Sequence, residues 1–202
     1  SKGLLITNFS SAAYYYHMLW QTKSNHNILT SRASKQIQPS ETKLIDTLYF
    51  ENFEDTSSFT QFSNEIKKSG NYSRKLQGES IVLHSIPKAS LVSGRYIKVT
   101  LNCFFTDNIP RFTAVWDLPY MYVQWMDQAD QPMNKYESGI YPFQYCGNPN
   151  FSIYSHGVLN TWGQVSYYVR IPNGPFTKAN LGIWNPKNAH FYIDDLTEEL
   201  HE

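Results

Sequence analysis

Aromatic side chains lie among amide and carboxylate side chains between residues 116 and 150, a combination that suits the binding of sugars. The C–H groups of a sugar ring pack on flat aromatic faces, while its hydroxyls hydrogen-bond to amides and carboxylates. Two short segments are the best candidates, because Pro119 and Pro142 interrupt any strand there and place neighbouring aromatic residues on loops. The predicted ligand-binding residues are Trp116, Asp117, Tyr120, Tyr141 and Tyr145.

The same aromatic residues have a second interpretation, as members of a hydrophobic core. With 15 Tyr, 12 Phe and 5 Trp in 202 residues, the chain must bury many of its rings. Alternate residues of a strand face opposite sides, so Trp125 shares a face with Val123 and Tyr122 lies on the other. Core is the default expectation for any single Trp.

Signatures of catalysis are absent from the sequence. It contains no GxSxG, HExxH, GxxxxGK[ST] or GxGxxG motif. The six histidines, at positions 17, 26, 84, 156, 190 and 201, never occur as an i, i+2 or i, i+4 pair. The sequence therefore predicts that the protein is not an enzyme.

Charge and hydropathy argue against two further classes of partner. The formal net charge is zero and the 17 basic residues are scattered, whereas nucleic-acid binding needs a basic patch. No run of 18 apolar residues is present, so this chain is predicted to contain no membrane span.

Short runs rich in β-branched and aromatic residues begin at Leu44, separated by turns such as Ser69-Gly70-Asn71. This pattern predicts an all-β fold, an antiparallel β-sandwich. The expected strands span residues 47–53, 73–77, 81–86, 95–106, 121–128, 134–144, 163–171, 180–184 and 191–196.

Residues 1–45 lack this pattern and are predicted to form an irregular N-terminal extension or linker. The chain opens with Ser1 instead of Met, so we expect it to be part of a larger parent protein. The two cysteines, Cys103 and Cys146, form no metal-binding pattern, and their spacing leaves open whether they are bridged.

An ordered series of segments resembles the carbohydrate-binding-module and galactose-binding-like group of jelly-roll domains. The series begins with Asn52-Phe53-Glu54-Asp55 and continues through Ser69–Leu76 and Ser93–Val99. It continues with Trp162–Ser166, leading to Ile171-Pro172, and closes with Phe191-Tyr192-Ile193-Asp194-Asp195-Leu196. The resemblance implies a jelly roll over residues 46–202. It also implies that Trp162 packs inside the sandwich and that Trp184, in a Trp-Asn turn before the last strand, is structural.

The resemblance also implies a structural calcium ion that joins the first and last strands. Calcium takes six to eight hard oxygen ligands, so carboxylates from opposite ends of the chain can hold it together with backbone carbonyls. Glu54, or alternatively Glu51, would supply the first carboxylate. Asp194 or Asp195 would supply the second, and only one of them is expected to bind, because neighbouring strand residues point to opposite faces.

Two functions remain open at this point. One is a non-catalytic, calcium-stabilised module that binds a glycan, within a secreted, extracellular, periplasmic or cell-envelope protein. The alternative is a structural or protein–protein interaction jelly roll of a membrane-attached protein, with no glycan ligand. The fold alone cannot distinguish them, because function resides in particular sites.

Overall fold

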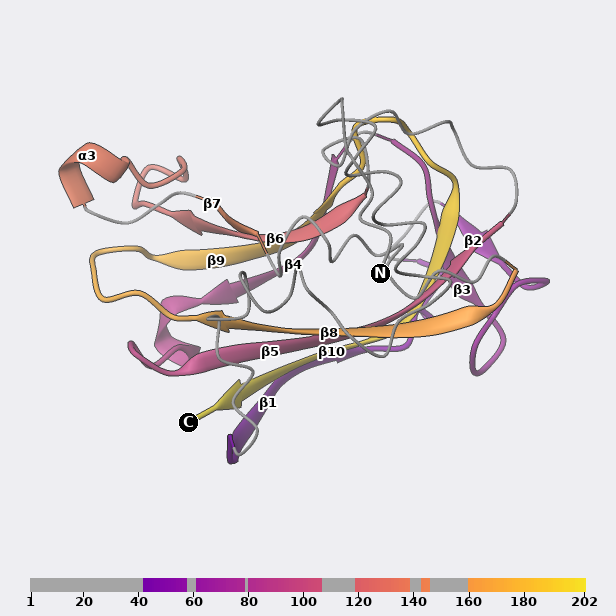
Figure 1. Cartoon of the computed structure of the whole chain (residues 1–202), viewed down its shortest axis with the longest axis horizontal. Helices are drawn as coiled ribbons and strands as arrows, with labels where there is room; N and C mark the ends of the chain where they lie inside the picture. The colour runs from indigo at the N-terminus through magenta and orange to yellow at the C-terminus, as the bar shows by residue number, and fades with distance from the viewer. Residues whose placement is uncertain (1–41, 58–60, 79, 107–118, 139–142, 146–159) are drawn as a thin grey trace, which may run out of the picture.

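Two antiparallel β-sheets face each other in the computed structural model, which describes residues 42–57, 61–78, 80–106, 119–138, 143–145 and 160–202. Sheet A has the order β2-β3-β10-β5-β8, with β1 also paired to β10, and sheet B has the order β4-β9-β6-β7. Figure 1 shows sheet A below sheet B, with the C-terminus beside β1. The fold is therefore the all-β sandwich that the sequence predicts.

Ten strands and two short helical turns are described in chain order. Sheet A consists of β1 (Leu44–Glu51), β2 (Phe62–Ser63), β3 (Ser73–Leu76), β5 (Tyr96–Phe105), β8 (Trp162–Arg170) and β10 (Phe191–His201). Sheet B consists of β4 (Ser80–Pro87), β6 (Tyr120–Met126), β7 (Phe143–Tyr145) and β9 (Lys178–Trp184). The helical turns are η1 (Lys88–Ser90) and α3 (Lys135–Ser138).

Alternation along the strands builds the core between the sheets. In β5 every second side chain is at most 1% exposed, and the residues between them face outward. Trp125 lies in this core at 1% exposure, on the same side as Val123, as the alternation predicts. The apolar residues of β5 and β9 that are 0% exposed are Ile97, Val99, Leu101, Cys103, Ala179, Leu181 and Ile183.

Two expectations about local structure were wrong. The strand expected over 134–144 is replaced by α3 and β7, because the Asn134 side chain accepts the Tyr136 N–H and starts a helical turn. Trp162 does not pack inside the sandwich. It pairs with Phe104 in the β5–β8 register and therefore lies on the outer face of sheet A.

Cys103 is a free thiol in the core of sheet A, and burial raises its pKa well above the ordinary value. Such a thiol is a packing group and a poor nucleophile. Cys146 lies outside the described residues. None of the described helices is long and apolar enough to cross a bilayer.

The two sheets are joined by a buried polar contact as well as by apolar packing. Glu198 of β10 is 0% exposed, and its Oε2 atom lies 2.8 Å from Nδ1 of His84 on β4. A register shift between Val82 and His84 redirects the imidazole toward sheet A. The ring of Tyr49 on β1 stacks on His84 with centroids 3.7 Å apart.

The surroundings of this contact are strongly desolvated. Burial and a hydrogen bond to Glu51 raise the pKa of Tyr49 to about 12. The other Glu198 oxygen, Oε1, is buried and has no hydrogen-bond partner among the described residues. His84 is therefore the main polar partner of this buried carboxylate.

Replacing His84 by Ala is expected to lower the free energy of unfolding by about 3–5 kcal/mol, because it leaves the Glu198 carboxylate buried and unpaired. The matched control is Lys98→Ala, which breaks the 2.9 Å Lys98–Glu199 pair on the outer face of sheet A, where the side chains are 28% and 20% exposed. That variant should lose at most about 1 kcal/mol. Urea unfolding measures both, and equal losses would contradict a special role for the buried pair.

Candidate functional site

The outer face of sheet B carries aromatic and amide side chains in aligned rows. Tyr120 of β6 pairs with Trp184 of β9, and both rings are partly exposed. Two residues along each strand, Tyr122 pairs with Gly182. Directly paired residues of an antiparallel sheet have Cβ atoms about 4.5–5.5 Å apart, so Tyr120 and Trp184 lie side by side.

In the middle row, the ring of Tyr122 lies over Gly182. A Cβ atom added at Gly182 would lie 2.5 Å from the Tyr122 ring and 2.7 Å from the Ile81 carbonyl oxygen. The Tyr122 hydroxyl lies 3.3 Å from the Ser80 hydroxyl, and the side chain is only 4% exposed. Tyr122 therefore forms part of the floor of this face, whereas Tyr120 and Trp184 can meet a ligand.

The third row supplies hydrogen-bonding groups. Gln124 of β6 pairs with Asn180 of β9, which in turn pairs with Ser85 of β4. The Ser85 hydroxyl donates to the Asn180 amide oxygen at 2.7 Å, which orients the NH₂ group of Asn180 away from Ser85. The face thus combines two partly exposed rings with two amides.

The residues predicted to bind a ligand divide into two groups. Tyr120 and Tyr145 are not on loops, as the neighbouring prolines predicted, but in the strands β6 and β7. Tyr120 lies on this face, and the backbone of Tyr145 pairs with Tyr122 beside it. Trp116, Asp117 and Tyr141 lie outside the described residues.

Sequence reasoning missed Trp184 and Asn180, although their spacing through Gly182 places all three on one side of a strand. Asn185, the residue after Trp184, has the structural role expected of this turn. It is 3% exposed, donates to the Ala189 carbonyl and accepts the Ala189 N–H.

A second cluster of polar residues connects the two ends of the domain. Glu54 follows β1, and its Oε1 atom accepts the N–H groups of Asn71 at 2.8 Å and Tyr72 at 3.0 Å. These donors lower the pKa of Glu54. A Cβ atom at Gly70 would overlap the carboxylate, and the φ of +54° at this residue also suits glycine.

The last strand contacts the same loop from the other side. Asp194 is 0% exposed, and its Oδ2 atom accepts the N–H groups of Lys68 at 2.9 Å and Ser69 at 3.1 Å. Burial raises the pKa of Asp194 despite these donors. Asp195 accepts the Ser69 hydroxyl at 2.8 Å and the Asn102 amide at 3.1 Å. We call Glu54, Asp194 and Asp195 the carboxylate clamp.

The expected alternation of Asp194 and Asp195 does not hold. Both carboxylates contact Ser69, because Asp195 has a φ of 49° and the β10–β5 register shifts between Asp194 and Thr197. Glu51 lies apart from the clamp. Its oxygens accept the Phe53 N–H at 2.7 Å and the Tyr49 hydroxyl at 3.0 Å.

The clamp satisfies only part of what calcium requires. Carboxylates from both ends of the chain meet on one loop, as the resemblance implies, but each accepts N–H groups that compete for the oxygens a cation would use. The described residues contain no group of three His, Cys, Asp or Glu side chains able to hold a metal. The calcium ion remains a prediction, with Glu54 and Asp194 as its best carboxylate ligands.

No protein-family model and no curated protein sequence matches this chain. Solved structures with a similar fold include the tandem CBM22-1–CBM22-2 domain of Xyn10C from Paenibacillus barcinonensis, at a TM-score of 0.51 and 12% identity, covering 80% of this chain and 46% of that one. The CBM22-1 xylan-binding domain of the same protein has a TM-score of 0.48 at 12% identity, covering 79% and 97%. A family 22 carbohydrate-binding module of Clostridium thermocellum Xyn10B has a TM-score of 0.48 at 14% identity, covering 76% and 94%. At these identities the similarity concerns the fold.

Asp194→Ala is expected to lower the free energy of unfolding by at least about 3 kcal/mol, because it removes the acceptor for the N–H groups of Lys68, Ser69 and Asp195. The control Asp46→Ala changes an exposed residue of β1 and should stay within about 0.5 kcal/mol of the parent protein. Denaturant unfolding followed by tryptophan fluorescence measures both. Similar stabilities for the two variants would show that the clamp does not hold the loop.

Proposed function

We propose that this domain is a non-catalytic carbohydrate-binding module that uses the outer face of sheet B. The observation that carries the proposal is the pairing of two partly exposed rings, Tyr120 and Trp184, across adjacent strands. Paired rings of this kind present C–H-binding surface to a sugar. The amide of the partly exposed Gln124 lies on the same face, where it can bind sugar hydroxyls, and Asn180, which is 8% exposed, lies beside it in the floor.

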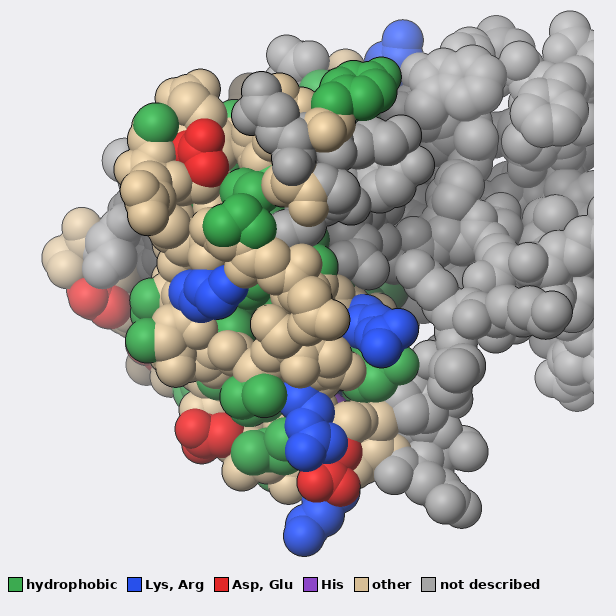
Figure 2. All heavy atoms as spheres, turned by 90° about the vertical axis from the view of Figure 1, so that its left-hand side faces the viewer, with side chains coloured by type: hydrophobic (Ala, Val, Ile, Leu, Met, Phe, Trp, Pro, Cys, Tyr) green, Lys and Arg blue, Asp and Glu red, His purple; other side chains and the backbone are tan. Residues whose placement is uncertain are grey.

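The character of the face indicates the class of ligand. The three rows described above contain Tyr, Trp, Gln, Asn, Ser, Val and Gly. The next row of the same face carries Lys178, paired with Met126, and the Asp130 carboxylate neutralises its ammonium group at 2.5 Å. An uncharged polysaccharide therefore fits better than a nucleic acid or an acidic glycan. At the end of the molecule that carries α3, Figure 2 shows basic and acidic side chains of the described residues interspersed, without a patch of one sign.

The setting of the domain is part of the same proposal. Modules of this fold occur beside other modules, as the tandem domain of Paenibacillus barcinonensis Xyn10C illustrates. We propose that this chain belongs to a larger extracellular or envelope protein, in which it holds that protein to a glycan. Catalysis would then reside elsewhere in the parent protein.

Trp184→Ala and Tyr120→Ala are each expected to weaken polysaccharide binding about 3- to 10-fold, because each removes one stacking surface. Affinity electrophoresis against soluble xylan, mixed-linkage β-glucan and galactomannan measures the effect. Xylan is included because one of the compared structures is a xylan-binding domain. The control is Val92→Ala, which alters an exposed residue outside both sheets.

The proposal fails if the parent protein migrates unhindered through every polysaccharide. It also fails if binding is present but Trp184→Ala and Tyr120→Ala bind as tightly as the control. The first result would favour a structural or protein–protein interaction domain with no glycan ligand.

We further propose that calcium binds at the carboxylate clamp through Glu54 and Asp194. A ligand that binds only the native state must raise its stability, so millimolar calcium should raise the Tm relative to EDTA. Glu54→Gln should reduce that difference, whereas Asp46→Asn should leave it intact. A melting temperature unmoved by chelator would contradict the calcium site, and the N–H contacts of the clamp would then hold the loop alone.

A further inference from the structure

We infer that the outer face of sheet A is a second binding surface for an uncharged polysaccharide, separate from the face of sheet B. Outer faces of antiparallel sheets are usually polar. Here aromatic side chains occur at outward positions of all four long strands. They are Phe50 on β1, Tyr96 and Phe104 on β5, Trp162 and Tyr168 on β8, and Tyr192 on β10.

Three of these rings form a cluster at one end of the face. Phe104 is the central ring, with the Trp162 centroid 5.5 Å away and the Tyr192 centroid 6.3 Å away. All three side chains are only partly buried. The planes meet at 57° and 77°, so the rings present edges and faces in more than one direction. Such a cluster suits the C–H groups of a twisted sugar chain.

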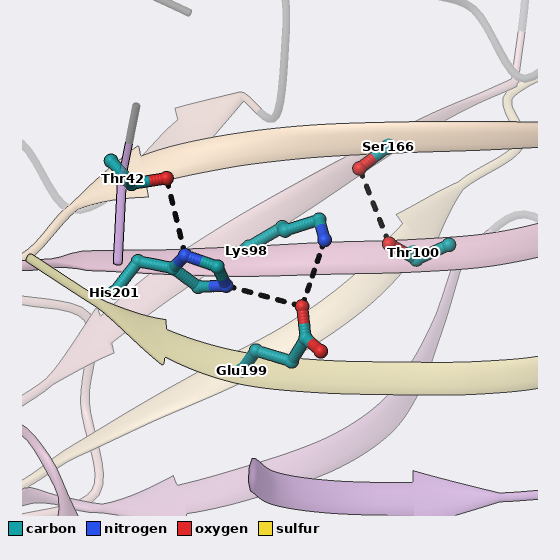
Figure 3. A network of polar contacts seen from close by, with 6 residues as sticks. All are labelled: Thr42, Lys98, Thr100, Ser166, Glu199 and His201. Carbon is teal, nitrogen blue, oxygen red and sulfur yellow. Dashed lines mark hydrogen bonds and ion pairs between the residues drawn. The ribbon is translucent and has the colours of Figure 1, made fainter. Parts of the chain in front are cut away.

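Hydroxyl and amide groups continue the face along β5 and β8. The hydroxyls of Thr100 and Ser166 lie 3.2 Å apart across these strands, as Figure 3 shows. Gln164 and Ser166 are exposed. Polar groups between aromatic rings match a ligand that alternates C–H faces and hydroxyls, whereas an apolar protein partner would need a continuous apolar patch.

The charged residues at the centre of this face neutralise one another, whereas Lys75 beside Tyr192 and Arg170 beside Tyr96 lie toward its two ends. Glu199 accepts a hydrogen bond from Lys98 at 2.9 Å and lies 3.1 Å from Nε2 of His201, whose Nδ1 lies 3.1 Å from the Thr42 hydroxyl (Figure 3). Tyr168 packs edge-on against His201 with centroids 5.6 Å apart. With the central pair satisfied in this way and the two other basic residues at opposite ends, the middle of the face suits an uncharged ligand.

The dimensions of the face fit a chain of sugars. From Phe104 to Tyr96 the strand advances eight residues, or about 26 Å at the usual rise of a β-strand. Phe50, which is 57% exposed, extends the aromatic surface across β10, because it pairs with Thr197 on the same face. Several sugar rings can therefore lie along this face at once.

This inference rests on the proposed function only for the class of ligand, because the residues involved are on the opposite sheet. Ser166→Arg tests it by placing a bulky charge in the middle of the face without removing any packed ring. Val92→Arg is the matched control, since it adds the same side chain at an exposed position outside both sheets. A second variant, Trp162→Ala, removes one ring of the cluster.

The assay is affinity electrophoresis in soluble xylan, mixed-linkage β-glucan and galactomannan, with a thermal melt to confirm that each variant folds. Ser166→Arg and Trp162→Ala should each weaken retardation about 3- to 10-fold relative to Val92→Arg. In the Trp184→Ala background, residual binding should persist and should disappear when Ser166→Arg is added.

The outcomes separate the two faces. Ser166→Arg and Trp162→Ala binding like the control, or complete loss of binding in Trp184→Ala alone, would overturn the second surface and leave the proposed function in place. Loss of binding in the sheet A variants alone would support this inference and contradict the proposed role of sheet B. A parent protein that binds none of the polysaccharides would overturn both.

Discussion

The structure depends on the break in β10 between Asp194 and Thr197. Before the break, β10 pairs with β3, and after it the strand pairs with β1, while β5 lies along its other side throughout. The break also sets which way the acidic residues of the strand point. Asp194 and Asp195 turn toward the loop at Ser69, Glu198 turns inward to His84, and Glu199 turns outward. One irregularity thus connects the chain ends, the two sheets and the outer face.

The strands could be predicted from the sequence because they follow from the alternation of buried and exposed residues, which is a local pattern. Regular strands such as β5 and β9 bury every second residue, and this signal is visible without knowledge of any partner strand. The opposite directions expected for Asp194 and Asp195 came from the same rule. It failed there because a bulge is set by pairing with two other strands, which no local pattern records. The helical turn at Asn134 was missed for a related reason, since a single cap outweighed the strand propensity around it.

The aromatic residues show how much of the candidate site can be predicted from the sequence alone. Core was the default expectation for any Trp, and Trp125 is buried. Tyr120 was expected on a loop beside Pro119 but is the first residue of β6, where it pairs with Trp184 on the outer face. Trp162 and Trp184 were assigned to structure because of their places in the motifs of the jelly-roll domains that the chain resembles. The face of the sheet on which each Trp lies is decided by its pairing with Phe104 or Tyr120. That pairing depends on strands that are far apart in the sequence. A Trp at a strand end therefore needs the partner strand before its role can be assigned.

Outward rings on both sheets have a consequence for the balance between stability and binding. Burial of apolar surface stabilises a fold by about 25 cal/mol per Å², and the exposed part of these rings does not contribute this stabilisation. This domain offsets the loss with contacts that fix its frame, since the buried Glu198–His84 pair and the carboxylate clamp connect elements far apart in the sequence. If the proposed function holds, a frame fixed in this way keeps Tyr120 and Trp184 aligned before a ligand arrives, so that less conformational entropy is lost on binding. The polar contacts within the fold therefore compensate for the aromatic residues that stay exposed on its outer faces.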